Sequence, residues 1–516
     1  MLQVHQNQVA EWRAPQGQAM VTAPDGQAFS LRSFQKADGN WYIRYASPQT
    51  GIHQYRAGDE AGEIEVVQYA GDNPLYKHGA VRKANKRYLE HGDGTPFFWL
   101  ADTWWMGLTT RLPYPDGFKE LLGDRVEKGF NVVQIIAGLY PDMDPFDPRG
   151  MNEAGYPWDK EFTAVNPAYF DAADKKIEAL VKNGIMPCVV GCWGYYMDFA
   201  GYDAISRHWD NLIDRWGAYP VCWCVAGEAV MPFYNNKDLK EGRITHEEYK
   251  IRIRAEWTKM TAHVKNTDPF GRLITIHPTE NGHEQVDDET LLDLDMLQTG
   301  HNGVMGLPNA IRQIKAAVDR RALPVINSEG YYEGICGSSF EDVQRYSFMA
   351  SVLAGCCGHT YGANGIWQFN TREKSYGPSP HGASWGETPW EDAYKLSGSR
   401  QVGLLKQLMT KLPWWRMELH PEWVPNPCNY EKLDGLICAG IPGELRVAYR
   451  SLFGGTVFGR QKFLALDGAY HAYYYNMIED ELRDLGMAEP DADGVWNFPG
   501  TGLLHDFVMV LTKTPL

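Results

Sequence analysis

Two glutamates, each at the end of an apolar run, have the chemistry that cleaving an acetal requires. Glu228 closes the run WCVAGE, and Glu329 closes the run PVINSE. Hydrolysis of a glycosidic bond uses two carboxyl groups, of which one stays protonated as the acid. The other is ionised and either attacks the sugar, with the carboxyls about 5–5.5 Å apart, or activates a water at about 6.5–9.5 Å. We take Glu228 and Glu329 as a candidate catalytic pair.

Other polar and aromatic residues also directly follow apolar runs. Aromatic side chains supply 13% of the sequence, and their faces can stack on sugar rings. The candidate substrate-binding residues are Asp102, Trp104, Trp105, Gln134, Trp193, His277, His301, Tyr331, Tyr361 and Trp367. Trp367 is expected beneath the reacting sugar, and His277 and His301 either orient Glu329 or bind hydroxyls. Glu333 is a second acid in the same loop as Glu329, but Glu329 directly ends its apolar run.

The elements that must position these residues alternate between apolar runs and helical segments. Eight such runs are expected as strands, at residues 96–102, 130–138, 185–193, 221–228, 273–278, 291–301, 323–329 and 356–369, the last of which includes the loop that follows its strand. Continuous rather than alternating apolar character indicates a parallel sheet covered by helices. We predict a (β/α)8 TIM barrel over residues 81–415, with its site at the carboxyl ends of the strands. A doubly wound open sheet is the alternative, although its glycine-rich phosphate turn is absent.

The segments that flank the barrel have the pattern of β structure. Near the N-terminus, Trp41, Ile43 and Tyr45 alternate with polar residues, which predicts a β-sandwich domain over residues 1–80. Residues 416–516 are predicted to form a C-terminal antiparallel β domain, in which Gly454-Gly455 is a turn. Residues 371–390, rich in Gly, Pro and Ser, follow the last barrel strand and are a candidate lid.

Composition and charge argue against several classes of partner. The net charge is −16 with no basic run, so nucleic acid is not expected as a partner. No apolar stretch reaches the length of a membrane helix. No secretory signal is visible, although a chain that had lost its signal would look the same. The nine cysteines are an odd number and several lie in apolar runs, so we expect a reduced, cytoplasmic protein. Nothing indicates an oligomeric state.

Metal and serine chemistry have weaker support. The run HPTENGHE (277–284) holds two His and two Glu but lacks helical HExxH spacing, and the first strand ends in Asp-Thr-Trp rather than an HxH pair. No GxSxG occurs. We therefore expect no metal and no cofactor. A metal-dependent hydrolase and a barrel that binds carbohydrate without catalysis remain the alternatives.

The chain resembles a known family in three motifs. DGTPFFWLADTWW, PVINSEGYYEG and GHTYGANGIWQF are similar to those of the apiosidase-like glycoside hydrolases, family 140 and its relatives. The resemblance implies a barrel with an N-terminal β-sandwich and a small C-terminal β domain. It also implies a retaining hydrolase, with Glu329 as nucleophile and Glu228 as acid/base. The family pattern has Gly-Asp where this chain has Gly227-Glu228.

The resemblance also implies an oligosaccharide or small glycoside as the substrate, of plant or microbial origin, with furanosides among the candidates. Long loops after the second and eighth strands (residues 139–166 and 371–390), together with the flanking β domains, favour a pocket rather than an open cleft. A pocket predicts exo cleavage, in which sugars are removed from a chain end.

Overall fold

The N-terminal region consists of two packed β-sheets, as predicted. A computed structural model of the chain describes residues 1–453, 461–500 and 505–516. The five-stranded sheet has the order β1 (Leu2–His5), β8 (Glu60–Val67), β7 (Gly51–Ala57), β3 (Gln18–Thr22), β4 (Ala28–Arg32). The three-stranded sheet has the order β2 (Ala10–Ala14), β6 (Trp41–Tyr45), β5 (Phe34–Gln35). Trp12, Val21, Ile43 and Ile64 lie in a core that these sheets share.

A short connecting region leads from these sheets into the barrel. It contains α1 (Pro74–Lys77) and a three-stranded antiparallel sheet of β9 (Val81–Lys83), β10 (Leu89–His91) and β11 (Pro96–Phe97). The predicted strand over 96–102 is therefore divided, because residues 96–97 pair in this small sheet and the first barrel strand begins at Trp99.

The central sheet has eight parallel strands, which confirms the predicted TIM barrel. Its order is β16 (Leu273–Thr275), β15 (Cys222–Cys224), β14 (Met186–Val190), β13 (Val132–Ile136), β12 (Trp99–Trp104), β19 (Gly358–Tyr361), β18 (Val325–Glu329), β17 (Asp295–Gln298). This is a circular permutation of the chain order, whereas a doubly wound sheet reverses direction at a switch point. Between β16 and β17, the Thr275 hydroxyl donates to the Leu294 carbonyl at 2.8 Å and the Asp293 N–H donates to the Ile274 carbonyl, also at 2.8 Å.

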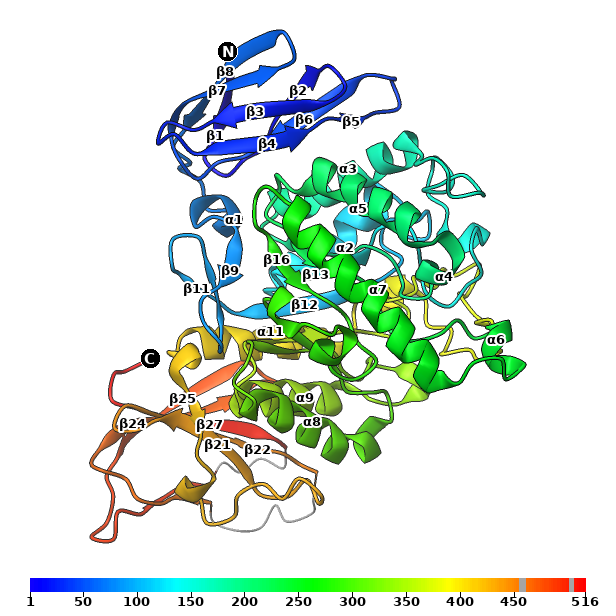
Figure 1. Ribbon diagram of the computed structural model, residues 1–516. Coiled ribbons are helices and arrows are strands. Elements are labelled where there is room, and N and C mark those ends of the chain that lie inside the picture. Colours follow the sequence, from blue (N-terminus) through cyan, green and yellow to red (C-terminus); the bar gives the residue numbers. More distant parts are fainter. Residues whose placement is uncertain (454–460, 501–504) are drawn as a thin grey trace.

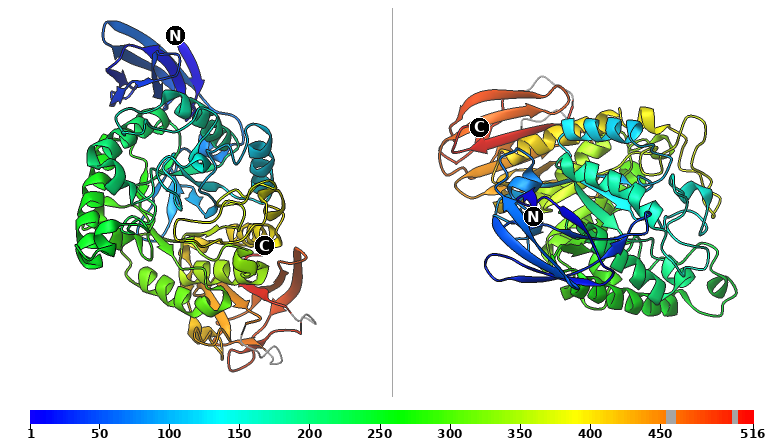
Figure 2. Two further views of the ribbon diagram at one scale, coloured as in Figure 1. Left: turned by 90° about the vertical axis from the view of Figure 1, so that its right-hand side faces the viewer. Right: turned by 90° about the horizontal axis from the view of Figure 1, so that it is seen from above.

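Helices surround the barrel strands, and Figure 2 (left) shows them as a ring when the molecule is turned by 90° from Figure 1. They are α2 (Asp116–Glu127), α3 (Pro167–Lys182), α4 (Tyr196–Ala200), α5 (Tyr202–Trp216), α6 (Lys237–Lys240), α7 (His246–Thr267), α8 (Leu307–Asp319), α9 (Glu341–Ala354), α10 (Trp390–Ala393) and α11 (Ser397–Thr410). Short 3-10 helices lie in the loops at Pro148–Gly150, Gly282–Gln285, Glu289–Leu291, Gly303–Gly306, Ile335–Gly337, Trp414–Arg416 and Pro421–Trp423. The Asn166 side chain caps α3 by accepting from the Ala168 N–H.

Two helices, α10 and α11, close the barrel segment after the last strand. The Gly398 N–H at the start of α11 donates to the Glu333 carboxylate at 3.0 Å, and a Cβ at residue 398 would lie 2.4 Å from that carboxylate. The second helix therefore begins where its free N–H groups meet a buried carboxylate, which the helix N-terminus stabilises.

The C-terminal region forms a six-stranded sheet with the order β20 (Glu418–Leu419), β21 (Leu436–Ile441), β22 (Leu445–Arg450), β27 (Phe507–Thr512), β24 (Tyr470–Asn476), β25 (Glu481–Ala488). A two-stranded sheet joins β23 (Lys462–Phe463) to β26 (Trp496–Asn497). Both faces of β22 are buried. Val447 and Tyr449 pack in the barrel's core, and Ala448 faces a separate core within the domain. The turn predicted at Gly454-Gly455 lies outside the described residues.

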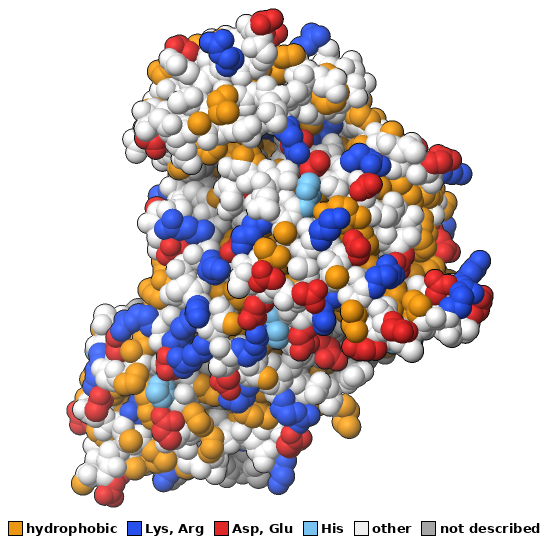
Figure 3. All heavy atoms as spheres, viewed as in Figure 1, with side chains coloured by type: hydrophobic (Ala, Val, Ile, Leu, Met, Phe, Trp, Pro, Cys, Tyr) orange, Lys and Arg blue, Asp and Glu red, His pale blue; other side chains and the backbone are white. Residues whose placement is uncertain are grey.

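The two β domains lie on opposite sides of the barrel in Figure 1 and in Figure 2 (left). Arg44 of β6 pairs with Asp174 of α3 at 2.7 Å, and Arg345 of α9 pairs with Asp506 at 2.7 Å. Lys, Arg, Asp and Glu side chains are interspersed over the face shown in Figure 3. None of the described helices is long and apolar enough to cross a membrane.

Candidate active site

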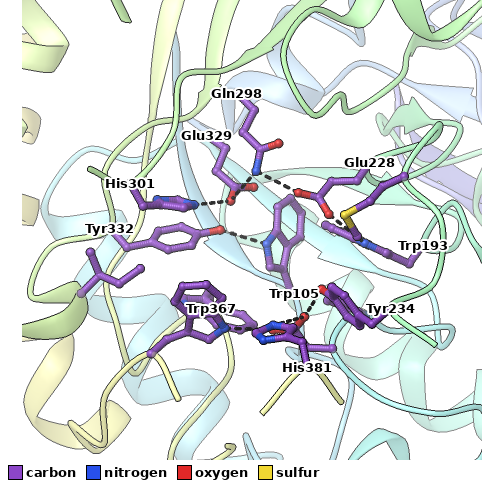
Figure 4. Close-up of a pocket in the computed structure, with 15 residues that line it drawn as sticks. Trp105, Trp193, Glu228, Tyr234, Gln298, His301, Glu329, Tyr332, Trp367 and His381 are labelled. Atoms are coloured by element: carbon purple, nitrogen blue, oxygen red, sulfur yellow. Dashed lines mark hydrogen bonds and ion pairs between the residues drawn. The ribbon is translucent and has the colours of Figure 1, made fainter. Parts of the chain in front are cut away.

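A pocket of about 350 Å³ lies at the carboxyl ends of the barrel strands. Figure 4 shows the side chains that surround it. They are Trp105, Pro141, Asp142, Trp193, Glu228, Met231, Tyr234, Gln298, His301, Glu329, Tyr332, Ile335, Trp367, His381 and Trp385. All come from the barrel segment, and no described residue of either flanking β domain lines the pocket. Six of the predicted site residues are brought together here: Trp105, Trp193, Glu228, His301, Glu329 and Trp367.

Glu329 is the last residue of β18, and two histidines hold its carboxylate. His277, which follows β16, places Nε2 at 2.9 Å from one carboxylate oxygen, and His301 places Nε2 at 3.0 Å from the other. Burial alone would raise the pKa of Glu329, but the hydrogen bonds from His277 and His301 outweigh it and lower the pKa below its ordinary value. Glu329 is thus held ionised, which a nucleophile requires.

Glu228 lies just beyond β15 on a strained backbone. Its φ is +43°, a left-handed value that non-glycine residues adopt rarely and at an energetic cost. The preceding Gly227 packs so closely that a Cβ there would lie 2.2 Å from the Trp193 ring. The indole N–H of Trp193 in turn lies 3.3 Å from the Glu228 carboxylate. Position 227 must therefore be glycine for Trp193 to reach Glu228.

The two carboxyl groups have opposite protonation. Burial and, second to it, the negative charge of Glu329 together raise the pKa of Glu228 to about 8. Glu228 is therefore protonated at neutral pH while Glu329 is ionised. Two carboxyls whose environments separate their pKa values in this way can serve as an acid and a nucleophile or base.

Gln298, the last residue of β17, bridges the two carboxyl groups. Its Nε2 lies 3.0 Å from Glu228 Oε1 and 3.2 Å from Glu329 Oε1. The two oxygens can therefore be no further apart than these two distances together. Gln298 was not predicted because the apolar run was expected to end at His301, whereas β17 ends at Gln298 and places that side chain at the pocket.

Aromatic rings form the floor and one wall of the pocket. His301 stacks on Tyr332 with ring centroids 4.6 Å apart, and Tyr332 stacks on Trp367 at 5.9 Å. The Trp105 indole N–H donates to the Tyr332 hydroxyl at 3.0 Å. These contacts hold the rings in fixed orientations and leave apolar faces for a sugar ring.

Asp102 and Trp104, predicted to contact substrate, lie outside the pocket. Both are completely buried. The Asp102 carboxylate accepts from Arg125 at 2.6 Å and from the Trp104 indole at 2.8 Å. Asp102 therefore neutralises the buried guanidinium of Arg125 from α2, a charge that would be costly to bury without a partner.

We expect Asp102→Ala to destabilise the fold by about 3 kcal/mol, because the buried Arg125 guanidinium keeps only the less buried Asp124 as its ion-pair partner and the Trp104 indole loses its acceptor. The measurement is unfolding in urea followed by intrinsic fluorescence. Asp392→Ala is the control, since it removes an ion pair with Arg372 that is exposed at the surface. Equal unfolding midpoints for the two variants would contradict this structural role for Asp102.

Three further residues predicted to bind substrate, Gln134, Tyr361 and Tyr331, do not line the pocket. The Gln134 amide donates to the Ser328 carbonyl at 2.9 Å, next to Glu329. The Tyr361 hydroxyl donates to the Glu333 carboxylate at 2.5 Å, and this hydrogen bond orients both side chains. Tyr331 is buried against Gly306, whereas its neighbour Tyr332 lines the pocket, because successive side chains of an extended segment point to opposite sides.

His277 also lies outside the pocket lining and acts through its contact with Glu329. The other histidine of the 277–284 run, His283, binds Asp295 at 2.7 Å, so the two histidines serve different carboxylates. Within the part of the chain that the structure describes, no group of three or more His, Cys, Asp or Glu side chains is arranged to hold a metal ion.

Several lining residues were not predicted because they lie in long loops rather than at strand ends. They are Pro141, Asp142, Met231, Tyr234, Ile335, His381 and Trp385. His381 and Trp385 belong to the candidate lid, 371–390, so its predicted position at the barrel mouth was the available signal. Pro141 and Asp142 belong to the other long loop expected to favour a pocket, 139–166, whereas no comparable signal marked Tyr234.

Comparison with known proteins gives one family and a set of similar structures. The model of the apiosidase-like catalytic domain matches residues 83–416. A glycoside hydrolase of known structure is 22% identical, with a TM-score of 0.69 over 86% of this chain and 99% of the other.

A family 5 glycoside hydrolase from Bacteroides vulgatus ATCC 8482 is also 22% identical, with a TM-score of 0.69 over 86% of this chain and 94% of the other. Another structure from that organism, 14% identical, has a TM-score of 0.69 and covers 100% of both chains. These likenesses support the fold. No protein with curated information matches the chain.

Proposed function

The chain belongs to the apiosidase-like glycoside hydrolases, and from this membership we propose that it is a retaining, exo-acting enzyme with Glu329 as nucleophile and Glu228 as acid/base. It is a glycosidase with a carbohydrate substrate. The proposed substrate is the terminal sugar, in pyranose or furanose form, of an oligosaccharide or small glycoside of plant or microbial origin.

The observation that carries the retaining mechanism is the Gln298 bridge. One amide nitrogen lies within hydrogen-bonding distance of both carboxyl groups, at 3.0 and 3.2 Å. The facing oxygens of the two groups therefore lie no further apart than these two contacts together, which favours the closer carboxyl spacing of retaining enzymes, about 5–5.5 Å, over the roughly 6.5–9.5 Å of inverting ones. A short separation supports direct attack by one carboxylate.

In the proposed first step, a Glu329 oxygen attacks the anomeric carbon and the bond from that carbon to the leaving oxygen breaks. Glu228 donates its proton to the leaving oxygen, so the leaving group departs neutral. In the second step, Glu228, now ionised, takes a proton from water, whose oxygen attacks the same carbon and releases Glu329. Glu228 ends protonated, and the sugar keeps its anomeric configuration.

Hydrogen bonds to Glu329 serve both steps. As the Glu329 oxygen shares its charge with the sugar, His277 and His301 have less negative charge to stabilise. When the covalent bond breaks, they receive the returning carboxylate in the same orientation. The raised pKa of Glu228 likewise suits a group that must hold a proton in one step and accept one in the next.

Exo action is supported by the size of the pocket. About 350 Å³ is near the lower end of ligand pockets, which run from roughly 300 to 1,000 Å³, and suits a short substrate. The loops that follow β13, β15 and β19 contribute Asp142, Tyr234 and His381 to one side of it. A long polysaccharide would need an open cleft instead.

The test is the configuration of the first product. A panel of aryl pyranosides and furanosides identifies the sugar, and NMR spectra taken in the first minutes of hydrolysis show the anomer that is released. We expect the released sugar to have the configuration of the substrate before mutarotation. Release of the opposite anomer would refute double displacement while leaving a glycosidase in place.

A further inference from the structure

We propose that Asp142 is a positioning residue that joins three loops into the wall of the pocket opposite the catalytic pair, and that this wall sets the affinity for the sugar. The inference rests on the proposed function, because it concerns the same pocket. Figure 4 places Tyr234 and His381 of this wall across the pocket from Glu329 and Gln298.

The Asp142 carboxylate binds side chains from two other loops. One oxygen accepts from the Tyr234 hydroxyl, in the loop after β15. The other oxygen accepts from the Ser379 hydroxyl at 2.8 Å and from the Trp385 indole at 3.1 Å, both in the loop after β19. Asp142 itself lies in the loop after β13. A single carboxylate thus connects three loops that are far apart in the sequence.

The backbone at Asp142 is strained, which indicates that its side-chain position is held by its surroundings. Its φ is +54°, in the left-handed region that favours glycine. The neighbouring Pro141 carbonyl accepts from the Tyr376 hydroxyl at 2.7 Å, and Arg149 donates to the Tyr376 carbonyl at 2.7 Å. These bonds hold the same two loops together beside the carboxylate.

The wall presents aromatic rings to the cavity. His381 packs edge-on against Tyr234, with ring centroids 4.6 Å apart, and against Trp385 at 5.6 Å. Each of these rings is on a loop that Asp142 holds. If the carboxylate were absent, Tyr234 and Trp385 would lose a buried hydrogen-bond acceptor, and the loop 376–385 would be held to the loop of Asp142 only at its Tyr376 end.

Asp142 is 6% exposed, and the hydrogen-bond donors to its carboxylate are neutral. The histidine of the wall, His381, lies at 4.0 Å. Negative charge therefore remains near the pocket and adds to that of Glu329 in raising the pKa of Glu228. Tyr234 and Tyr332 also face Glu228, and Gln298 and Trp193 donate hydrogen bonds to it.

The experiment compares Asp142→Asn with Asp144→Asn, which removes the same charge from an exposed position in the same loop. With an aryl glycoside, we expect D142N to raise KM at least 10-fold with a much smaller change in kcat. We also expect it to lower the upper pKa of the profile of kcat/KM against pH, because Glu228 loses a negative neighbour. D144N should match the unmodified enzyme in both. Ser379→Ala keeps the charge, so it should raise KM without moving the pH profile.

Hydrogen–deuterium exchange tests the same contacts without any turnover. We expect faster exchange in residues 376–385 of D142N, with the barrel strands unchanged, and no such change in D144N. Equal exchange and equal KM in D142N and D144N would overturn the inference. Absence of hydrolysis by the unmodified protein would count against the proposed function, and the exchange measurement would still decide the role of Asp142.

Discussion

Glu329→Ala should lose on the order of 10⁴-fold or more in kcat, equivalent to about 5 kcal/mol of transition-state stabilisation. The loss is expected because no other described carboxylate in the pocket is held by His277 and His301, and without a nucleophile no covalent intermediate forms. The measurement is steady-state hydrolysis of an activated aryl glycoside. Circular dichroism and thermal unfolding check that the variant is folded.

Sodium azide gives this variant a second and more specific readout. Azide can enter the space that the Glu329 carboxylate leaves and attack the anomeric carbon in a single displacement. We expect partial recovery of activity and a glycosyl azide of inverted configuration. A glycosyl azide of retained configuration would contradict the assignment of Glu329 as nucleophile.

Glu333→Gln is the matched control for Glu329. Glu333 is four residues along the same segment and is also buried, but its carboxylate binds the Tyr361 hydroxyl and the Gly398 N–H outside the pocket. We expect kcat of E333Q to stay within about 10-fold of the unmodified enzyme. A loss as large as that of E329A would move the candidate nucleophile to Glu333.

Glu228→Gln should produce a loss that depends on the leaving group. For aryl glycosides with poor leaving groups we expect kcat/KM to fall about 10²–10⁴-fold, the usual contribution of general acid catalysis. Dinitrophenyl glycosides need little protonation, so their kcat/KM should change far less. The measurement is a plot of log kcat/KM against leaving-group pKa, which should be steeper for E228Q. Parallel plots would exclude Glu228 as the acid.

The pH profile provides an independent check on the same residue. Activity requires Glu228 protonated and Glu329 ionised. Because the pKa of Glu228 is raised to about 8, kcat/KM should decline as pH rises through that value. Because the pKa of Glu329 is lowered, activity should persist well into the acid range. The upper limb should disappear in E228Q, and its persistence there would assign that limb to another group.

The barrel and the two proposed catalytic glutamates were predictable because both depend on local patterns. Apolar runs separated by helical segments specify a parallel sheet, since each strand must be covered on both faces. Parallel strands all end at one edge, so a carboxylate that directly follows a run, such as Glu228 or Glu329, must lie at that edge. The end of the strand expected within residues 291–301 was harder to place, because two polar residues, Gln298 and His301, follow the apolar part of that run.

The substrate-binding residues were predicted less well, because position at a strand end does not determine direction. Asp102 ends an apolar run as Glu329 does, but its carboxylate pairs with Arg125 of α2 and does not face the pocket. Tyr331 and Tyr332 differ by one position, and only the second faces the cavity. Whether such a side chain faces the pocket depends on the charged group or ring that another element places beside it.

By itself the sequence determined the fold class, the flanking β domains and the family, since these follow from periodicity and short motifs that contiguous residues carry. Only the tertiary structure decided that Gln298 joins the two carboxyl groups and that Asp142 joins three loops. Both depend on side chains that are distant in the chain and close in space. Hydrogen bonds act over about 3 Å, so their partners are defined only once the barrel has brought its strand ends and loops together.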